Sequence, residues 1–169
     1  MVFVGIVTDS KSENNIEKLL STSSFFNENN VIFIKEKNIN NIKNVHFDTV
    51  IVNKEFSKME ELNKVLASAK NISINADISL SKEELNITNS NLITYGFNSK
   101  SSITISSVTD DDVLVCIQRN IYSNYGEIEV QEIKLENNIN YSIYDLIIVL
   151  VLFFMYIPDH STININSKK

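Results

Sequence analysis

The sequence predicts an α/β protein with a Rossmann-like, mainly parallel sheet, flanking helices and a small antiparallel β-subdomain. Up to about Phe97, short apolar runs alternate with helix-start signals, which is the pattern of βαβ units in a parallel sheet. After Gly96, apolar runs follow one another with only turns between them, as in antiparallel hairpins. We expect a single domain over residues 1–157, with a parallel part at 2–97, hairpins at 101–136, an apolar helix at 141–157 and then a polar tail at 158–169.

The composition restricts the class of protein. The chain has 169 residues, enough for one sizeable core, and its 43% hydrophobic and 21% charged residues are ordinary for a globular domain. A net charge of −6 argues against a surface that binds nucleic acid or acidic lipid. Cys116 is the single cysteine, which excludes an internal disulfide framework, and Met1 is not followed by a signal peptide. We therefore expect a cytoplasmic protein in a reducing compartment.

The parallel part contains five predicted strands and three predicted helix starts. The strands are the apolar runs at residues 2–7, 31–34, 47–52, 72–74 and 92–95. Pairs of Ser and Glu at capping-box spacing mark the helix starts, namely Ser10 with Glu13, Ser57 with Glu60, and Ser81 with Glu84. The first helix is expected at residues 11–20. The second has the clearest apolar periodicity, from Phe56 to Ala69. Residues 38–44 are expected to be an Asn-rich connector.

The hairpin part has predicted strands at residues 102–108, 113–118 and 128–135. The acidic residues 110–112 lie in a turn and are expected to be solvated rather than to bind a cation. Cys116 alternates with apolar neighbours and is expected to be a core residue rather than a nucleophile. A small sheet leaves an edge strand free, and pairing with a second copy across a twofold axis would cover it.

The segment from Tyr141 to Ile157 is predicted to be a buried helix and not a transmembrane span. Its unbroken apolar part has about a dozen residues, whereas a span needs about 20. Ser142 is a suitable N-cap, which places Asp145 in the first turn, where its charge favours the helix dipole. Because this helix is apolar nearly all round, the fold or a partner chain must cover it. The alternative is a short C-terminal membrane anchor.

Several polar residues are candidates for binding. Asn75 and Asp77 follow a predicted strand, and a carboxamide offers the donor and acceptor needed at a purine edge, although both residue types are also typical of turns. Residues 8–12 read Thr-Asp-Ser-Lys-Ser and could hold an anion at a helix N-terminus; the alternative is an ordinary N-cap.

A second group of candidates lies around a predicted hairpin loop. Arg119, Tyr122 and Tyr125 are residue types common at the hot spots of protein interfaces. The alternative is an exposed loop without a partner. The sequence thus leaves both a protein partner and a homodimer open.

The order of motifs resembles the second half of the central, ATP-binding domain of Mur ligases, the amide-forming enzymes of peptidoglycan precursor synthesis. The resemblance covers roughly residues 47–157. It rests on a strand followed by Asn75-Ala76-Asp77, a strand ending in Tyr95-Gly96-Phe97, antiparallel hairpins, and Tyr-Ser-Ile-Tyr-Asp-Leu-Ile opening an apolar helix. In that family the Asn-Ala-Asp turn lies beside the adenine. The resemblance therefore implies Asn75, Asp77 and Tyr95 as candidate nucleotide-binding residues.

The departures from the family indicate what has been lost. A Mur ligase needs a phosphate loop with a Gly-Lys pair, and this sequence has none. Ile78 stands where the family has a second Asp, and no ligase domain follows before Lys169. No catalytic set or metal motif can be assembled, so we expect neither an enzyme nor a bound cofactor. The expected function is a non-catalytic, Mur-ligase-like binding or accessory module linked to the cell envelope. The alternatives are a nucleotide-binding protein or enzyme that retains an adenine site near Asn75, and a membrane-tethered accessory protein.

Overall fold

The computed structural model describes residues 2–21, 30–80, 85–137 and 140–158. The strands are β1 (Val4–Val7), β2 (Val31–Ile34), β3 (Thr49–Val52), β4 (Asn71–Asn75), β5 (Asn91–Gly96), β6 (Ile103–Val108), β7 (Asp112–Ile117), β8 (Ile121–Ser123), β9 (Gly126–Ile128) and β10 (Gln131–Glu136). The helices are α1 (Ser10–Ser21), α2 (Ile39–Ile42), α3 (Met59–Leu66) and α4 (Ile143–Tyr156).

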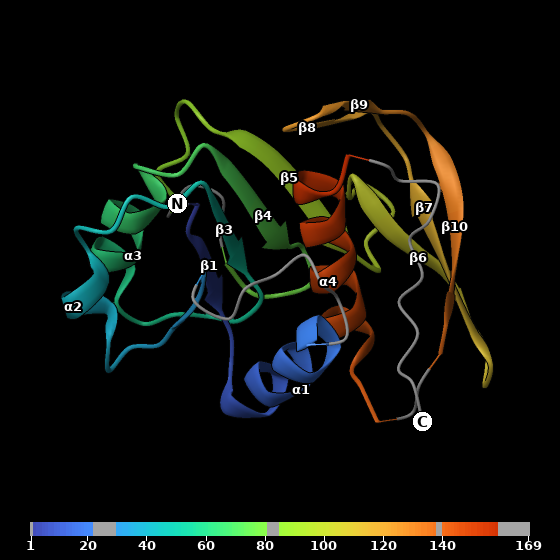
Figure 1. The fold of residues 1–169 in the computed structure, drawn as a ribbon, viewed down its shortest axis with the longest axis horizontal. Helices are drawn as coiled ribbons and strands as arrows, with labels where there is room; N and C mark the ends of the chain where they lie inside the picture. Colours follow the sequence, from blue (N-terminus) through green and yellow to red (C-terminus); the bar gives the residue numbers. More distant parts are fainter. Residues whose placement is uncertain (1, 22–29, 81–84, 138–139, 159–169) are drawn as a thin grey trace.

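One eight-stranded sheet runs through the molecule in the order β10-β7-β6-β5-β4-β3-β1-β2, and β8 with β9 forms a separate two-stranded antiparallel sheet (Figure 1). Neighbouring strands from β2 to β6 are parallel, whereas β7 and β10 are antiparallel additions at one edge. The predicted fold class is therefore confirmed. Strand β1 lies between β2 and β3, so the order in which strands are added reverses at β1. In open α/β sheets, ligands usually bind beyond the carboxyl ends of the strands at the point where the strand order reverses.

The hairpin strands differ from the prediction in two ways. They extend the parallel sheet, because β6 begins level with the end of β5 and pairs with it through Tyr95–Ile103 and Gly96–Thr104. This stagger lets β6 continue in the direction of β5 without the helical crossover that parallel neighbours usually need. The strand predicted at 128–135 is also interrupted, since β9 ends at Ile128 and β10 begins at Gln131. The break allows the chain to leave the small β8–β9 sheet and rejoin the large one.

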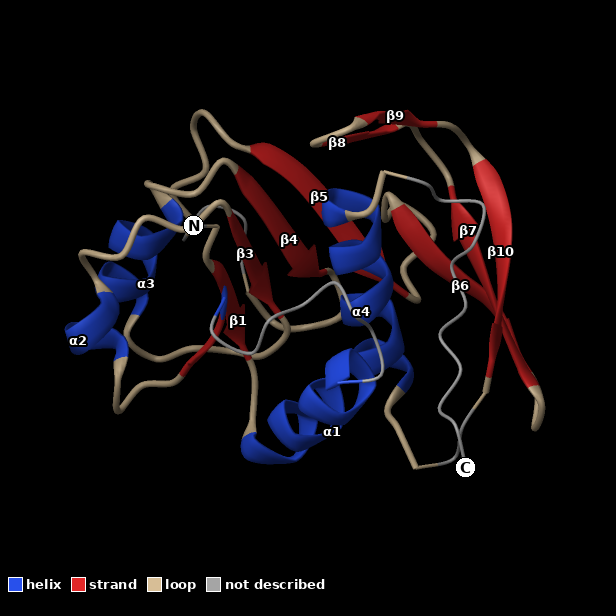
Figure 2. Ribbon diagram, in the orientation of Figure 1, coloured by secondary structure: helices blue, strands red, loops and turns tan. Residues whose placement is uncertain are grey.

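Helices cover the two faces of the sheet in separate layers (Figure 2). On one face, α1 and α4 pack with Val4, Ile6 and Ile51 in the larger apolar cluster. On the other face, residues of α2 and α3 pack with Val50, Ile72 and other side chains that point the opposite way along the same strands. The alternation follows from the strand period of two residues, so one apolar run supplies both cores.

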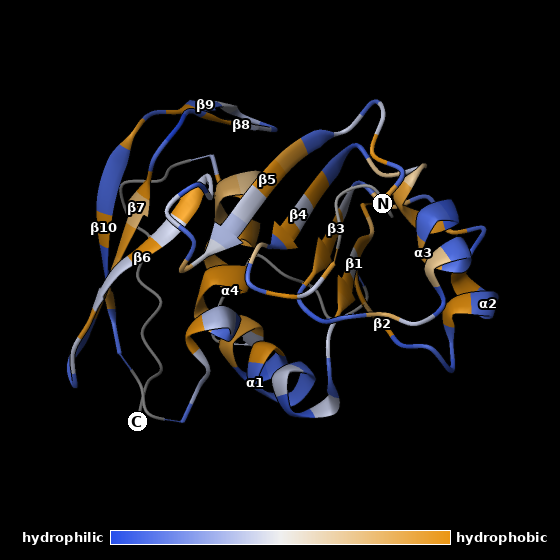
Figure 3. Ribbon diagram, turned by 180° about the vertical axis from the view of Figure 1, so that it is seen from behind, coloured by the Kyte–Doolittle hydropathy of each residue, from blue (hydrophilic) through white to orange (hydrophobic). Residues whose placement is uncertain are grey.

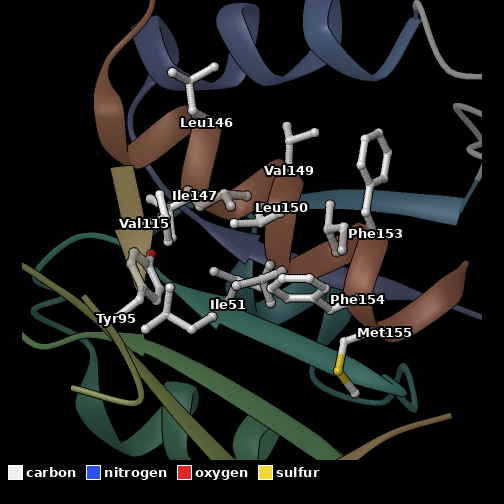
Figure 4. Close-up of a cluster of buried hydrophobic side chains, with 14 of the residues drawn as sticks. Ile51, Tyr95, Val115, Leu146, Ile147, Val149, Leu150, Phe153, Phe154 and Met155 are labelled. Carbon is white, nitrogen blue, oxygen red and sulfur yellow. The ribbon is translucent and has the colours of Figure 1, made fainter. Parts of the chain in front are cut away.

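Helix α4 is buried along its length, as predicted. Every residue from 145 to 155 is at most 6% exposed. Leu146, Val149 and Phe153 point toward α1, whereas Ile147 and Phe154 point toward the sheet (Figure 4). The antiparallel strands β6, β7 and β10 curl around the remaining side (Figure 1). The chain itself thus covers this helix without a partner. Nowhere in the described ranges is a helix both long and apolar enough to cross a membrane.

Of the helix starts expected from the sequence, the one at Ser142 has a side-chain cap and the one at Ser57 does not. The capping box of α4 is present: Ser142 Oγ accepts from the N–H of Tyr144, and Asp145 accepts from the N–H of Ser142. The predicted capping box at Ser57 is wrong, because α3 begins at Met59 without a side-chain cap. The N–H of Ser57 instead donates to Glu36 Oε1 at 2.9 Å, a tertiary contact that replaces the local one.

The first helix also starts differently from the prediction. Its cap is Asp9 rather than Ser10, because β1 ends at Val7 and α1 already includes Ser10. Part of the predicted connector at 38–44 forms the single helical turn α2, held by Asn38, whose Oδ1 accepts from the N–H of Lys35. The predicted helix start at Ser81 and Glu84 lies outside the described residues.

Candidate functional site

Polar side chains from neighbouring parallel strands meet at the carboxyl edge of the sheet. Asn53 follows β3, Asn75 ends β4 and Tyr95 lies near the end of β5. The Oδ1 atom of Asn53 accepts from Asn75 Nδ2 at 3.1 Å and from the Tyr95 hydroxyl at 3.0 Å. Its Nδ2 atom lies 3.5 Å from Thr8 Oγ1, just after β1. The structure therefore brings Asn75 and Tyr95 together through Asn53, a residue that the sequence analysis did not single out.

The Asn75 side chain is used within the chain. Its Oδ1 atom accepts from the N–H of Asp77 at 3.0 Å, which closes the turn after β4. With its bond to Asn53, the amide has one donor and one acceptor engaged, and one of each remains. The side chain is only 3% exposed. This geometry favours the role of a turn residue and leaves Asn75 a limited capacity to read a base.

Tyr95 is fully buried beneath α4, at 0% exposure. Burial raises the pKa of its hydroxyl well above the usual value, and the nearby charge of Asp145 raises it further. A buried, neutral phenol that donates to Asn53 is a fixed element of the interior. Among the three predicted nucleotide-binding residues, Tyr95 is therefore the one least able to touch a ligand from solvent.

Asp77 fastens two segments to the end of the sheet. Its Oδ2 atom accepts from the N–H of Phe97 at 2.6 Å and from the Tyr144 hydroxyl at 2.9 Å, and its Oδ1 atom accepts from the N–H of Asn98 at 3.2 Å. Burial, followed by the bond to Asp77, raises the pKa of Tyr144 to about 12. The rings of Phe97 and Tyr144 also meet edge to face, with centroids 6.0 Å apart. Asp77 thus ties the loop after β5 to the first turn of α4.

The buried carboxylate of Asp145 is partly unsatisfied. Its Oδ2 atom accepts from Asn15 Nδ2 of α1 at 2.8 Å and from the N–H of Ser142 at 3.2 Å. Its Oδ1 atom has no hydrogen-bond partner in the part of the chain that the structure describes. A buried carboxylate with a free oxygen is costly in free energy, so Asn15 is an important contact between α1 and α4.

The N-terminus of α1 already holds an anion of the chain itself. Only Thr8 and Asp9 separate β1 from α1, and Asp9 Oδ1 accepts from the N–H of Lys11 at 3.0 Å and of Ser12 at 2.9 Å. The bond from Ser12 is the main cause of the lowered pKa of Asp9, and the positive charge of Lys54, 3.7 Å away, adds to it. The segment at 8–12 is thus an ordinary N-cap, the alternative that the sequence left open.

Three hollows among the described residues lie at the carboxyl edge on the α3 side of the sheet, and the smallest, about 200 Å³, is lined by Asp9, Lys35 and Lys54 among others. Of the other two, the first, about 340 Å³ in volume, lies over β4 and β5 and is lined by Asn75, Thr94 and Lys100 together with aliphatic side chains. The second, about 440 Å³, lies beside β3 and is lined by Lys54, Phe56 and others. Leu80 borders both, so they are neighbours along the same edge.

The predicted partner-binding residues are exposed but face different ends of β5. Tyr122 is 61% and Tyr125 58% exposed on the β8–β9 hairpin, and the carbonyl of Tyr122 accepts from Asn91, the first residue of β5. Arg119 donates to the carbonyl of Lys100, beyond the end of β5. The two tyrosines therefore share a surface that does not include the guanidinium group.

The remaining candidates, Cys116 and the acidic residues 110–112, do not form a catalytic or metal-binding site with other described residues. The prediction that Cys116 is a core residue is wrong. It is half-buried on the face of β7 opposite to the buried residues Val113, Val115 and Ile117, with its Sγ 3.6 Å from Glu132 Oε1. The acidic turn at 110–112 continues into β7, where Asp112 pairs with Lys134. Across the described ranges, no group of three or more His, Cys, Asp and Glu side chains is arranged to hold a metal ion.

The sequence matches no protein family, and no curated protein is similar to it.

Proposed function

We propose that the chain is a non-catalytic, Mur-ligase-like module that binds a protein partner or a cell-envelope precursor. The observation that carries this proposal is Asp9. In nucleotide-binding α/β proteins the amides at the start of such a helix receive a phosphate. Here a carboxylate of the chain occupies them, at 2.9 and 3.0 Å. A phosphate would have to displace this carboxylate and would be repelled by its charge.

The order of elements supports the family resemblance. The Asn75-Ala76-Asp77 turn and the Tyr95-Gly96-Phe97 strand end lie side by side at one edge of the sheet, where Ala76 N donates to the carbonyl of Tyr95 at 2.7 Å. The apolar helix α4 begins next to them through the Tyr144–Asp77 bond. In this proposal the chain retains the arrangement of strands and turns that resembles the Mur-ligase domain. The Asp9 carboxylate occupies the N–H groups at the start of α1, where a nucleotide-binding protein would hold phosphates.

Thermal shift and phosphate-release assays test the proposal. A ligand at a hundredfold excess over its Kd adds about 2.7 kcal/mol to the free energy of unfolding. We expect UDP-linked sugars to raise the Tm through contacts to the sugar and away from the α1 N-terminus. We expect ATP with Mg²⁺ to leave the Tm unchanged, without release of phosphate. Asp9→Ala is the matched variant, since it frees the α1 amides. Phosphate release above the blank that is lost on substitution near Asn75 would contradict the proposal.

A nucleotide site near Asn75 is the second candidate function. It is favoured by the 340 Å³ cavity, which Asn75 and Asn98 both line. Adenosine tests it directly, because adenosine lacks the phosphates that Asp9 would repel. A Tm increase with adenosine but not with UDP-sugars would favour this function over the first.

The protein-partner form of the proposal is supported by the β8–β9 hairpin, whose Tyr122 and Tyr125 are more than half exposed. Exposed tyrosines offer a large contact area at low entropic cost. Strand β10 ends the sheet order, and its outer edge, which pairs with no described strand, could pair with a second copy. Light scattering tests the homodimer: a monomeric mass of the wild-type chain would exclude it and leave only a different partner.

A further inference from the structure

The 340 Å³ cavity lies over the carboxyl ends of β4 and β5. On this face of the sheet α3 packs with Val50 and Ile72, whereas α1 and α4 lie on the opposite face (Figure 3). The volume is at the small end of the range for small-molecule pockets, about 300–1,000 Å³. At about 30 Å³ for each water-sized group, it holds roughly ten such groups.

The body of the cavity is aliphatic. Its described apolar lining residues are Ile74, Ala76, Ile78, Leu80, Leu85, Ile87 and Leu92. Ile74 and Leu85 are buried, whereas Leu92 is 39% exposed at the rim. No aromatic ring lines this space, so a stacked base would meet only aliphatic side chains. An aliphatic chain would bury the exposed apolar surface at about 25 cal/mol for each Å².

One rim of the cavity is positively charged. Lys100 lines it, and its ammonium group forms no ion pair with any residue that the structure describes. The guanidinium group of Arg119 is held at the same loop by its 2.9 Å bond to the Lys100 carbonyl. The carboxylate of Asp77 lies at the same loop, where the N–H groups of Phe97 and Asn98 already donate to it. The two cations still leave the loop with a net positive charge, which favours an anion.

Hydrogen bonds within the chain fix the loop at residues 98–101, which forms this rim. The N–H of Lys100 donates to Asn98 Oδ1 at 2.9 Å, and the N–H of Ser101 donates to the Asn98 carbonyl at 2.9 Å. Asp77 accepts from the N–H of Asn98 and so anchors the loop to the end of β4. Ser101 also lines the cavity, and its buried hydroxyl has no partner among the described residues. A fixed loop lowers the entropic cost of binding.

The geometry points to a binding site for a small aliphatic carboxylate, with its chain among the aliphatic side chains and its head at Lys100. This inference is independent of the proposed function, because neither the α1 N-terminus nor the β8–β9 hairpin takes part. It differs from the adenosine site in the class of ligand, since it needs a negative head and no hydrogen-bonding ring edge.

Octanoate, below its micellar concentration, is the probe, and octanol is its uncharged control. Isothermal titration of the full chain gives the Kd, and amide NMR shifts locate the ligand. We expect saturable octanoate binding with shifts at Leu85, Ile87 and Leu92. Lys100→Gln should weaken octanoate binding by about two- to fivefold, as for an exposed ion pair. It should leave octanol binding unchanged.

Two further variants make the test decisive. Lys43→Gln removes an exposed cation that does not line the cavity and should leave octanoate binding unchanged. Ala76→Phe places a ring in the cavity and should abolish binding, with circular dichroism checking that this variant is folded. The inference is overturned by absent octanoate binding, by shifts elsewhere in the wild-type chain, or by equal effects of Lys100→Gln and Lys43→Gln. If Ala76→Phe does not fold, the inference is still tested by the NMR shifts of the wild-type chain and by the comparison of Lys100→Gln with Lys43→Gln.

Discussion

The substitution Gly96→Ala tests whether the hydrogen bonds of Asp77 stabilise the carboxyl edge of the sheet. Gly96 has φ of +142° and Gly126 has φ of +136°, so both adopt backbone conformations that L residues rarely take. Strain of this kind costs about 1–3 kcal/mol at either position. The surroundings differ, because a Cβ at Gly126 would meet nothing within 4 Å. At Gly96 it would collide with Asp77 Oδ2 and lie 2.8 Å from its Cγ.

The extra cost at Gly96 follows from the contacts of Asp77. The carboxylate must move, and it then loses good geometry with the N–H groups of Phe97 and Asn98 and with the Tyr144 hydroxyl. Hydrogen bonds to charged groups contribute about 1.5–3 kcal/mol each when well formed. Because Asp77 is exposed, we take the loss as equivalent to about one such bond. Gly96→Ala should therefore lower the free energy of unfolding by about 2 kcal/mol more than Gly126→Ala.

Urea denaturation followed by circular dichroism measures both variants, with Gly126→Ala as the matched control. Combining Gly96→Ala with Asp77→Ala completes a double-mutant cycle. In the Asp77→Ala background the alanine at 96 should cost only the backbone strain. If Gly96→Ala and Gly126→Ala are equally destabilising, the clash with Asp77 does not determine the stability of this edge.

Three further predictions concern the caps and tyrosines. Asp9→Ala should lower the free energy of unfolding by about 0.5–2 kcal/mol, and Ser10→Ala by much less, in urea denaturation; the reverse order would disprove the cap. The hydroxyl of Tyr156 donates at 2.6 Å to Asp48, so Tyr156→Phe should cost about 1–3 kcal/mol in the same assay, and no change would refute the contact. Tyr144 has a pKa raised to about 12, above its unfolded value of about 10, so its contribution to stability is complete below pH 10 and disappears toward pH 12. The loss of stability between these pH values should be smaller in Tyr144→Phe, and an equal loss in both proteins would contradict the raised pKa.

The pattern of the sequence determined the class of fold. Apolar runs such as 49–52 and 72–74 are buried on both faces, which is the mark of a parallel strand, and the uninterrupted apolar segment of α4 could only be stable inside the molecule. Asn75 and Asp77 could be recognised as turn residues at a strand end for the same local reason. These features depend on periodicity and on residue type, so they are visible without any tertiary contact.

Tertiary structure decided which of the local signals are used. Ser57 has the spacing of a capping box, yet its N–H bonds to Glu36, 21 residues away in the chain. Asn53 has no local signal and becomes the centre of the polar network only because β3 lies next to β4 and close to β5. The cover of α4 by β6, β7 and β10 likewise depends on how the sheet curls after Gly96. Strand neighbours and sheet curvature come from contacts between distant residues, and no single stretch of sequence contains that information.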